Sequence, residues 1–91
     1  MAELDASQVR QVWLSDGPRR QALFEVAGVS GNDTVDLAAL GQFARIMQVQ
    51  VVAVSGTGGI GTPGLPGGGV VAFPSGLASD AVLMLVDGIR P

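Results

Sequence analysis

Apolar and polar residues alternate along much of this chain, a pattern typical of β-strands that bury one face. From Arg19 to Ala27 the alternation places Ala22, Phe24 and Val26 on a single face. A run of β-branched residues from Val49 to Val54 predicts a further strand, because such side chains favour extended backbone. This run leads into a stretch so rich in glycine and proline that we expect neither helix nor strand to continue through it.

The remaining pattern predicts four more strands, at residues 8–14, 34–37, 70–73 and 80–87. In the first of them, strict alternation places Val9, Gln11 and Trp13 on one face. Turn-forming residues 15–18 follow it, so the first two strands are expected to form a hairpin. Residues 37–46 have apolar positions at helical spacing but contain a glycine, and predict a short helical turn or an irregular crossing.

Short strands separated by turn signals, without a long helix between them, predict an all-β fold. We expect a small antiparallel β-sandwich or barrel with a long Gly/Pro-rich loop. The 91 residues are enough for one domain, 1–91, and for no second one. Within it, residues 1–7 are expected to be a flexible N-terminal arm and residues 55–69 a Gly-rich loop.

The composition predicts association with another chain. The sequence is 47% hydrophobic and only 14% charged, and a domain of this size cannot bury so much apolar surface by itself. A homo-oligomer, with a trimer favoured, is therefore expected, although numerous small Ala and Val residues would also raise the apolar fraction. The net charge of -3 argues against nucleic acid as a partner. No apolar run is long enough to span a membrane, and residues 1–10 lack the pattern of a signal peptide.

Two patterns in the glycine-rich stretch are similar to those of a dinucleotide-binding turn and of collagen. Residues 52–61 combine an apolar run with glycines, as in a dinucleotide-binding turn. The helix that such a turn requires cannot form in the following Gly/Pro segment, so nucleotide binding is not favoured. Glycines at 58, 61, 64 and 67 follow a collagen-like period, which is too short for a triple helix and favours a loop with polyproline character.

A cluster of oxygen-bearing side chains, Asn32, Asp33 and Asp36, has two interpretations. Hard cations such as calcium bind several oxygens. The same residues also form turns readily, and the spacing is not that of an EF-hand loop. The turn interpretation is favoured, so we predict no metal and no cofactor.

The inventory of reactive side chains argues against an enzyme. The chain has no His, Cys, Lys or Tyr, which leaves Asp, Glu, Ser and Thr as candidate catalytic groups. The residues that remain of interest are candidates for an interface, where Trp and Arg are enriched: Trp13, Arg19, Arg20 and Phe73. For Trp13, the only tryptophan, a core position is an equally good interpretation.

Three segments, GVSGNDTVDL (28–37), QVVAVSGTG (50–58) and SGLASDAVLMLVDG (75–88), resemble in general style the small structural proteins of tailed-phage virions, such as head decoration or cement proteins. The resemblance covers most of the chain and carries over no functional residue. It implies a β-rich, often trimeric protein that binds a shell built of a major capsid protein and catalyses nothing. It also implies location in the virion, and in the host cytoplasm before assembly. The alternative is a small ligand-binding module, carbohydrate-binding or calcium-dependent.

Overall fold

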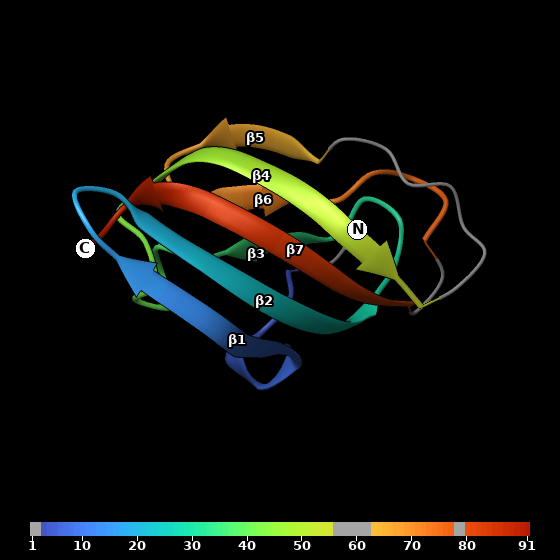
Figure 1. The fold of residues 1–91 in the computed structure, drawn as a ribbon. Helices are drawn as coiled ribbons and strands as arrows, with labels where there is room; N and C mark the ends of the chain where they lie inside the picture. The colour runs from blue at the N-terminus through green and yellow to red at the C-terminus, as the bar shows by residue number, and fades with distance from the viewer. Residues whose placement is uncertain (1–2, 56–62, 78–79) are drawn as a thin grey trace.

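Two antiparallel sheets, packed face to face, form the fold (Figure 1). The computed structural model describes residues 3–55, 63–77 and 80–91. The described residues form one 3-10 turn, η1 (Ala6–Gln8), and seven strands: β1 (Val9–Asp16), β2 (Arg20–Val29), β3 (Thr34–Asp36), β4 (Arg45–Val54), β5 (Gly64–Gly67), β6 (Val70–Ala72) and β7 (Asp80–Ile89). The predicted all-β class is confirmed, and the alternative left open from the sequence resolves to a sandwich.

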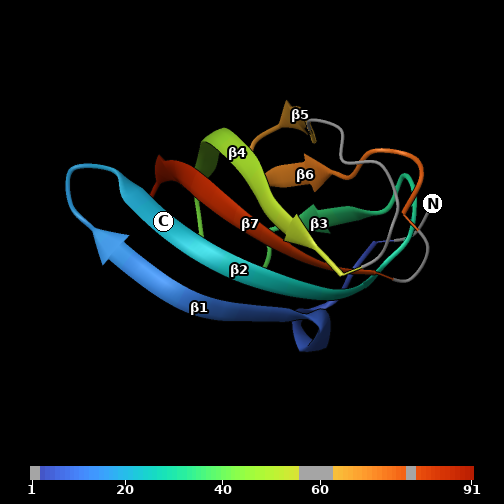
Figure 2. The ribbon, with the colours of Figure 1, turned by 45° about the vertical axis from the view of Figure 1, so that its right-hand side comes forward.

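The larger sheet has the strand order β1-β2-β7-β4 and the smaller sheet the order β3-β6-β5. All strand pairs are antiparallel, and β1 and β2 form the predicted hairpin. Strand β7 is an interior strand, paired with β2 on one side and β4 on the other. Figure 2 shows the small sheet behind the larger one, with β1 extending beyond the part that the small sheet covers.

The core lies between the sheets and follows the predicted alternation. Ala22, Phe24 and Val26 of β2 pair with Val86, Met84 and Val82 of β7, and all six are fully buried. The Phe24 ring meets the Phe43 ring edge to face, with 6.2 Å between centroids. The other buried apolar residues come from both sheets and the connections: Leu4, Val29, Val35, Leu37, Ile46, Val49, Val71, Phe73 and Leu77.

Gly88 allows β4 and β7 to approach closely beside Phe43. A Cβ atom at this position would overlap the carbonyl oxygen of Arg45 and lie 3.0 Å from both Ile46 Cα and Phe43 Cδ1. Real Cβ atoms do not tolerate such contacts with backbone, so only glycine fits here. The close approach also brings the end of β7 near the segment before β4, where the Ala44 N–H donates to the Ile89 carbonyl at 2.8 Å.

In the described part of the predicted N-terminal arm, residues 3–7, Leu4 packs against the domain and the other four residues are exposed. Leu4 is only 5% exposed, and its N–H donates to the Thr34 carbonyl at 2.7 Å. Gln8 then donates from its side chain to the Ala27 carbonyl at 2.9 Å. A single apolar side chain and two hydrogen bonds thus hold a segment whose short polar sequence predicted an arm.

The predicted Gly-rich loop also contains a strand. Gly64–Gly67 forms β5, the outermost strand of the small sheet. Because an edge strand needs hydrogen bonds on one side only, Pro66 is compatible with this position despite lacking an N–H group. Gly68, at φ 57°, then turns the chain into β6. The remaining residues of this stretch between 56 and 62 lie outside the described residues.

Three β-bulges interrupt β1 and β4, the two edge strands of the larger sheet. In β1 the register shifts between Gln11 and Trp13, and in β4 it shifts between residues 46 and 48 and between 51 and 53. At each shift, two residues of the edge strand lie opposite one residue of the neighbouring strand. Trp13 is therefore paired with Leu23 and lies on the face opposite to Gln11, which is paired with Phe24. The predicted placement of Trp13 on the face of Gln11 is wrong for this reason.

Candidate interaction surface

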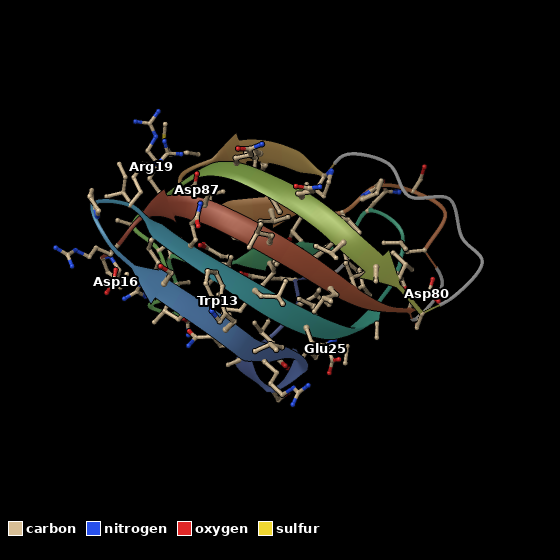
Figure 3. The ribbon with its side chains drawn as sticks, in the orientation of Figure 1. Trp13, Asp16, Arg19, Glu25, Asp80 and Asp87 are labelled. Atoms are coloured by element: carbon tan, nitrogen blue, oxygen red, sulfur yellow. The ribbon has the colours of Figure 1, made fainter. Side chains whose placement is uncertain are left out.

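The side of the larger sheet that is turned away from the smaller sheet is not covered by any other layer of the described residues, and we call it the outer face (Figure 3). The strand registers determine which side chains share it. They are Arg10, Trp13 and Ser15 of β1, Gln21, Leu23 and Glu25 of β2, Leu83, Leu85 and Asp87 of β7, and Gln48, Gln50 and Ala53 of β4.

The centre of the outer face is apolar. The register aligns Trp13, Leu23 and Leu85 in one row across three strands. The adjacent row brings Leu83 beside Ala53. Trp13 remains 48% exposed, and Figure 3 shows it projecting from the β1–β2 side of the sheet. A continuous apolar patch in the middle of an exposed sheet face is characteristic of a surface that contacts another molecule.

The two bulges of β4 add apolar side chains to this surface, and the bulge of β1 leaves a further apolar side chain exposed. The inserted residues Val12, Met47 and Val52 are 48%, 46% and 53% exposed. In β4 the pattern of burial shows the effect, because two consecutive exposed residues separate the buried Ile46 from the buried Val49. The bulges thus keep the inner face of β4 in register with the core and leave the extra side chain on the solvent side.

Charged residues on the outer face are paired with each other. Arg10 forms an ion pair with Glu25 at 3.4 Å, and Arg19 reaches from the β1–β2 turn to pair with Asp87. Of the eight Asp and Glu side chains in the chain, Glu25 and Asp87 are the two that lie on the outer face. The negative charge that dominates the whole chain therefore lies elsewhere, and the outer face is close to neutral.

A shallow depression of about 240 Å³ opens on the outer face at the β7–β4 side. Its lining is mostly apolar and includes the Ser55 hydroxyl and the carboxylate-bearing Glu25, which is labelled in Figure 3: Glu25, Ala53, Val54, Ser55, Ala81, Val82 and Leu83. The Ser55 hydroxyl accepts a hydrogen bond from the Ala81 N–H at 2.9 Å and so contributes to the pairing of β4 with β7. The depression offers an apolar recess rather than a set of convergent polar groups.

The four residues that the sequence suggested as interface candidates have different environments. Trp13 and Arg19 lie at the surface of the outer face. Arg20 lies at the end of the inner face, where its Nη1 donates to the Gln42 carbonyl at 2.7 Å and its guanidinium carbon is 6.0 Å from the Phe43 ring centroid. Phe73 is 2% exposed and belongs to the core, so its side chain is not available to a partner.

Sequence reasoning missed Leu23, Leu83 and Leu85 as surface candidates. The signal was present in β7, whose segment Val82 to Val86 is apolar at every position. A strand with one face in water alternates, whereas a continuous apolar run indicates that both faces meet apolar surroundings. In this structure one face of β7 is buried and the other forms part of the outer face.

The Asn32 to Asp36 cluster forms turns, as the favoured interpretation predicted. The Asp33 carboxylate accepts the Ser30 N–H at 2.9 Å, and Asp36 Oδ1 accepts the N–H groups of Ala38 and Ala39, each at 3.1 Å. These oxygens therefore cap backbone donors. Within residues 3–55, 63–77 and 80–91, no group of three or more carboxylate, His or Cys side chains could hold a metal ion.

The glycines that resemble a dinucleotide-binding turn, at 56–61, lie outside the described residues. In the described part of the chain, no helix is long and apolar enough to cross a membrane. Comparison with known proteins found no matching family model, no matching curated protein and no matching solved structure. The interpretation of this surface therefore depends on its own geometry.

Proposed function

We propose that this protein is a non-enzymatic structural protein that works by assembling with copies of itself and with a larger shell, as a virion decoration or cement protein does. The observation that carries the proposal is the apolar outer face, centred on Trp13, Leu23 and Leu85. A two-layer sandwich needs only one apolar face per sheet. An apolar patch on the other face of the same sheet supports a role in assembly, because its exposure is costly unless another molecule covers it.

The chemistry of the described residues fits this role better than catalysis or ligand binding. The depression on the outer face lacks the convergent polar groups that fix a small ligand. The carboxylates that suggested calcium are committed to backbone N–H groups. The resemblance to tailed-phage structural proteins supports the virion as the assembly concerned, with a major capsid protein as the further partner.

Self-association is tested by the solution mass, measured by light scattering after size exclusion over a range of concentrations. We expect an oligomer whose mass falls on dilution, and a monomer at every concentration would contradict self-association. The virion role is tested by mass spectrometry of virus particles purified from the source of the chain. We expect the protein in a constant ratio to a major capsid protein, and its absence from particles would contradict that role.

A further inference from the structure

We propose that the occupant of the outer face is a second copy of this chain, related by a two-fold axis, with Trp13 of each copy inserted into the depression of the other. This inference rests on the proposed function, because it identifies the contact through which the protein self-associates. The contact uses one surface, the outer face, and one partner, a second copy of the chain.

The outer face carries both a projection and a recess. Trp13 projects from the β1 side and is half exposed. The apolar depression lies on the same face near the other edge, between β7 and β4. A two-fold axis in the plane of the interface exchanges these two positions, so one rotation makes both insertions at once. An isologous contact requires this kind of self-complementary patch.

The outer face is large enough for a specific contact between two copies. Its four strands contain eight to ten residues each. With about 3.3 Å per residue and about 4.8 Å between strands, the face covers roughly 500 Å² in projection. Two copies packed face to face would then hide about 1,000 Å² in total, which reaches the lower limit for a specific interface. Packing of two sheet faces is also a standard arrangement in β proteins.

The distribution of charge favours contact through the outer face. The net charge of the chain is -3, so two copies repel each other at long range. On the outer face, however, Glu25 and Asp87 are each neutralised by an arginine of the same chain. Contact through this face therefore brings paired charges and apolar side chains together and keeps the excess carboxylates apart. The carboxylates that would attract a strongly basic partner lie away from this face.

The free edge of β1 is the competing route for self-association, and the structure disfavours it. The bulge at Val12 divides the edge into two short segments, residues 9–11 and 13–16. Bulges on edge strands obstruct regular pairing with a further strand. Face-to-face packing does not use these backbone groups and is unaffected by the bulge.

The experiment follows the mass and the fluorescence of the intact chain together. Trp13 is the only tryptophan, so intrinsic emission reports its environment alone. We expect the mass to rise from one chain to two with increasing concentration. The emission of Trp13 should shift to shorter wavelength over the same range of concentration, because the ring leaves water.

Two variants test the insertion and one serves as a matched control. Ala53→Arg places a long charged side chain in the depression but leaves Trp13 intact, and should weaken dimerisation at least about tenfold and abolish the shift in emission. Trp13→Ser should weaken dimerisation to a similar extent. Ala39→Arg makes the same change at an exposed alanine after β3 and should alter neither property. Thermal unfolding should show that all three variants remain folded, since each changes an exposed position.

The outcomes separate this inference from the proposed function. A dimer weakened by Ala53→Arg and Trp13→Ser but not by Ala39→Arg supports both. An oligomer that the outer-face variants leave unchanged, or a trimer, overturns the inference and leaves self-assembly standing, because a trimer requires a heterologous contact. A wild-type chain that stays monomeric with constant emission overturns both.

Discussion

Replacing Gly88 by alanine is expected to destabilise the domain through one unavoidable steric overlap. The new Cβ atom would collide with the Arg45 carbonyl oxygen and crowd Ile46 Cα and Phe43 Cδ1. Two of these three contacts are with backbone, which cannot move without disturbing the β4–β7 ladder. Overpacking of this kind costs about 3 kcal/mol at the upper end of the usual range.

An opposing effect reduces this value. Alanine restricts the unfolded chain more than glycine does, which stabilises the folded state by about 0.4–1 kcal/mol. The net loss of unfolding free energy is then about 2 kcal/mol, and for a domain of this size the Tm should fall by about 8–16 °C. Urea unfolding measured alongside thermal unfolding gives both quantities for the same protein.

Gly17→Ala is the matched control, because the nearest atom to its Cβ would be the Arg19 carbonyl oxygen at 3.9 Å. We expect this variant to stay within about 0.5 kcal/mol of the wild type. If Gly88→Ala were as stable as Gly17→Ala, the close approach of β4 to β7 would be wrong as described.

Three further predictions concern the residues that the sequence singled out. Arg20→Ala should lower the free energy of unfolding by about 1.5–3 kcal/mol, because it removes a charged hydrogen bond to the Gln42 carbonyl and the contact with Phe43. Arg19→Ala should lower it by about 0–1 kcal/mol, since it removes an exposed ion pair. Equal losses of unfolding free energy in urea would refute this difference. Asp33→Ala should cost about 1–3 kcal/mol, since the Ser30 N–H loses its acceptor at a buried site, and an unchanged Tm would contradict that account. Millimolar calcium should leave the Tm of the wild type unchanged, and a rise of several degrees would reveal a calcium site.

The strands of the core could be predicted because their chemistry is local. Alternation in β2 identified Ala22, Phe24 and Val26 as an inward-facing set, and the structure buries all three. Turn residues between strands likewise predicted the β1–β2 hairpin. Such features need no knowledge of which other segment lies opposite, and the sequence contains all the information required.

The failures arise where tertiary contacts override the local pattern. Alternation placed Trp13 on the wrong face because the bulge in β1 forms against β2, and nothing in β1 alone marks the inserted residue. The strand β5 was missed because glycine and proline are poor strand formers, and only its pairing with β6 makes it a strand. Phe73 was proposed for an interface although it fills the core, since aromatic side chains serve in both places.

The candidate surface was predictable in part. The excess of apolar residues indicated that some of them remain uncovered, and Trp13 was among the candidates. The contribution of Leu23, Leu83 and Leu85 depends on the order of the strands, which brings β7 between β2 and β4. Strand order in an antiparallel sheet is a long-range property, so the composition revealed that a patch exists but not where it lies.

The bulge at Val12 has a consequence for aggregation. A long regular edge strand is a template on which chain after chain can add, and growth of that kind ends in fibres. In β1 the regular edge extends for residues 9–11 and 13–16 only, so a strand that begins to pair loses its register within a few residues. In the assembly role that we propose, this interruption would block open-ended growth at the edge and leave a closed contact through a face available.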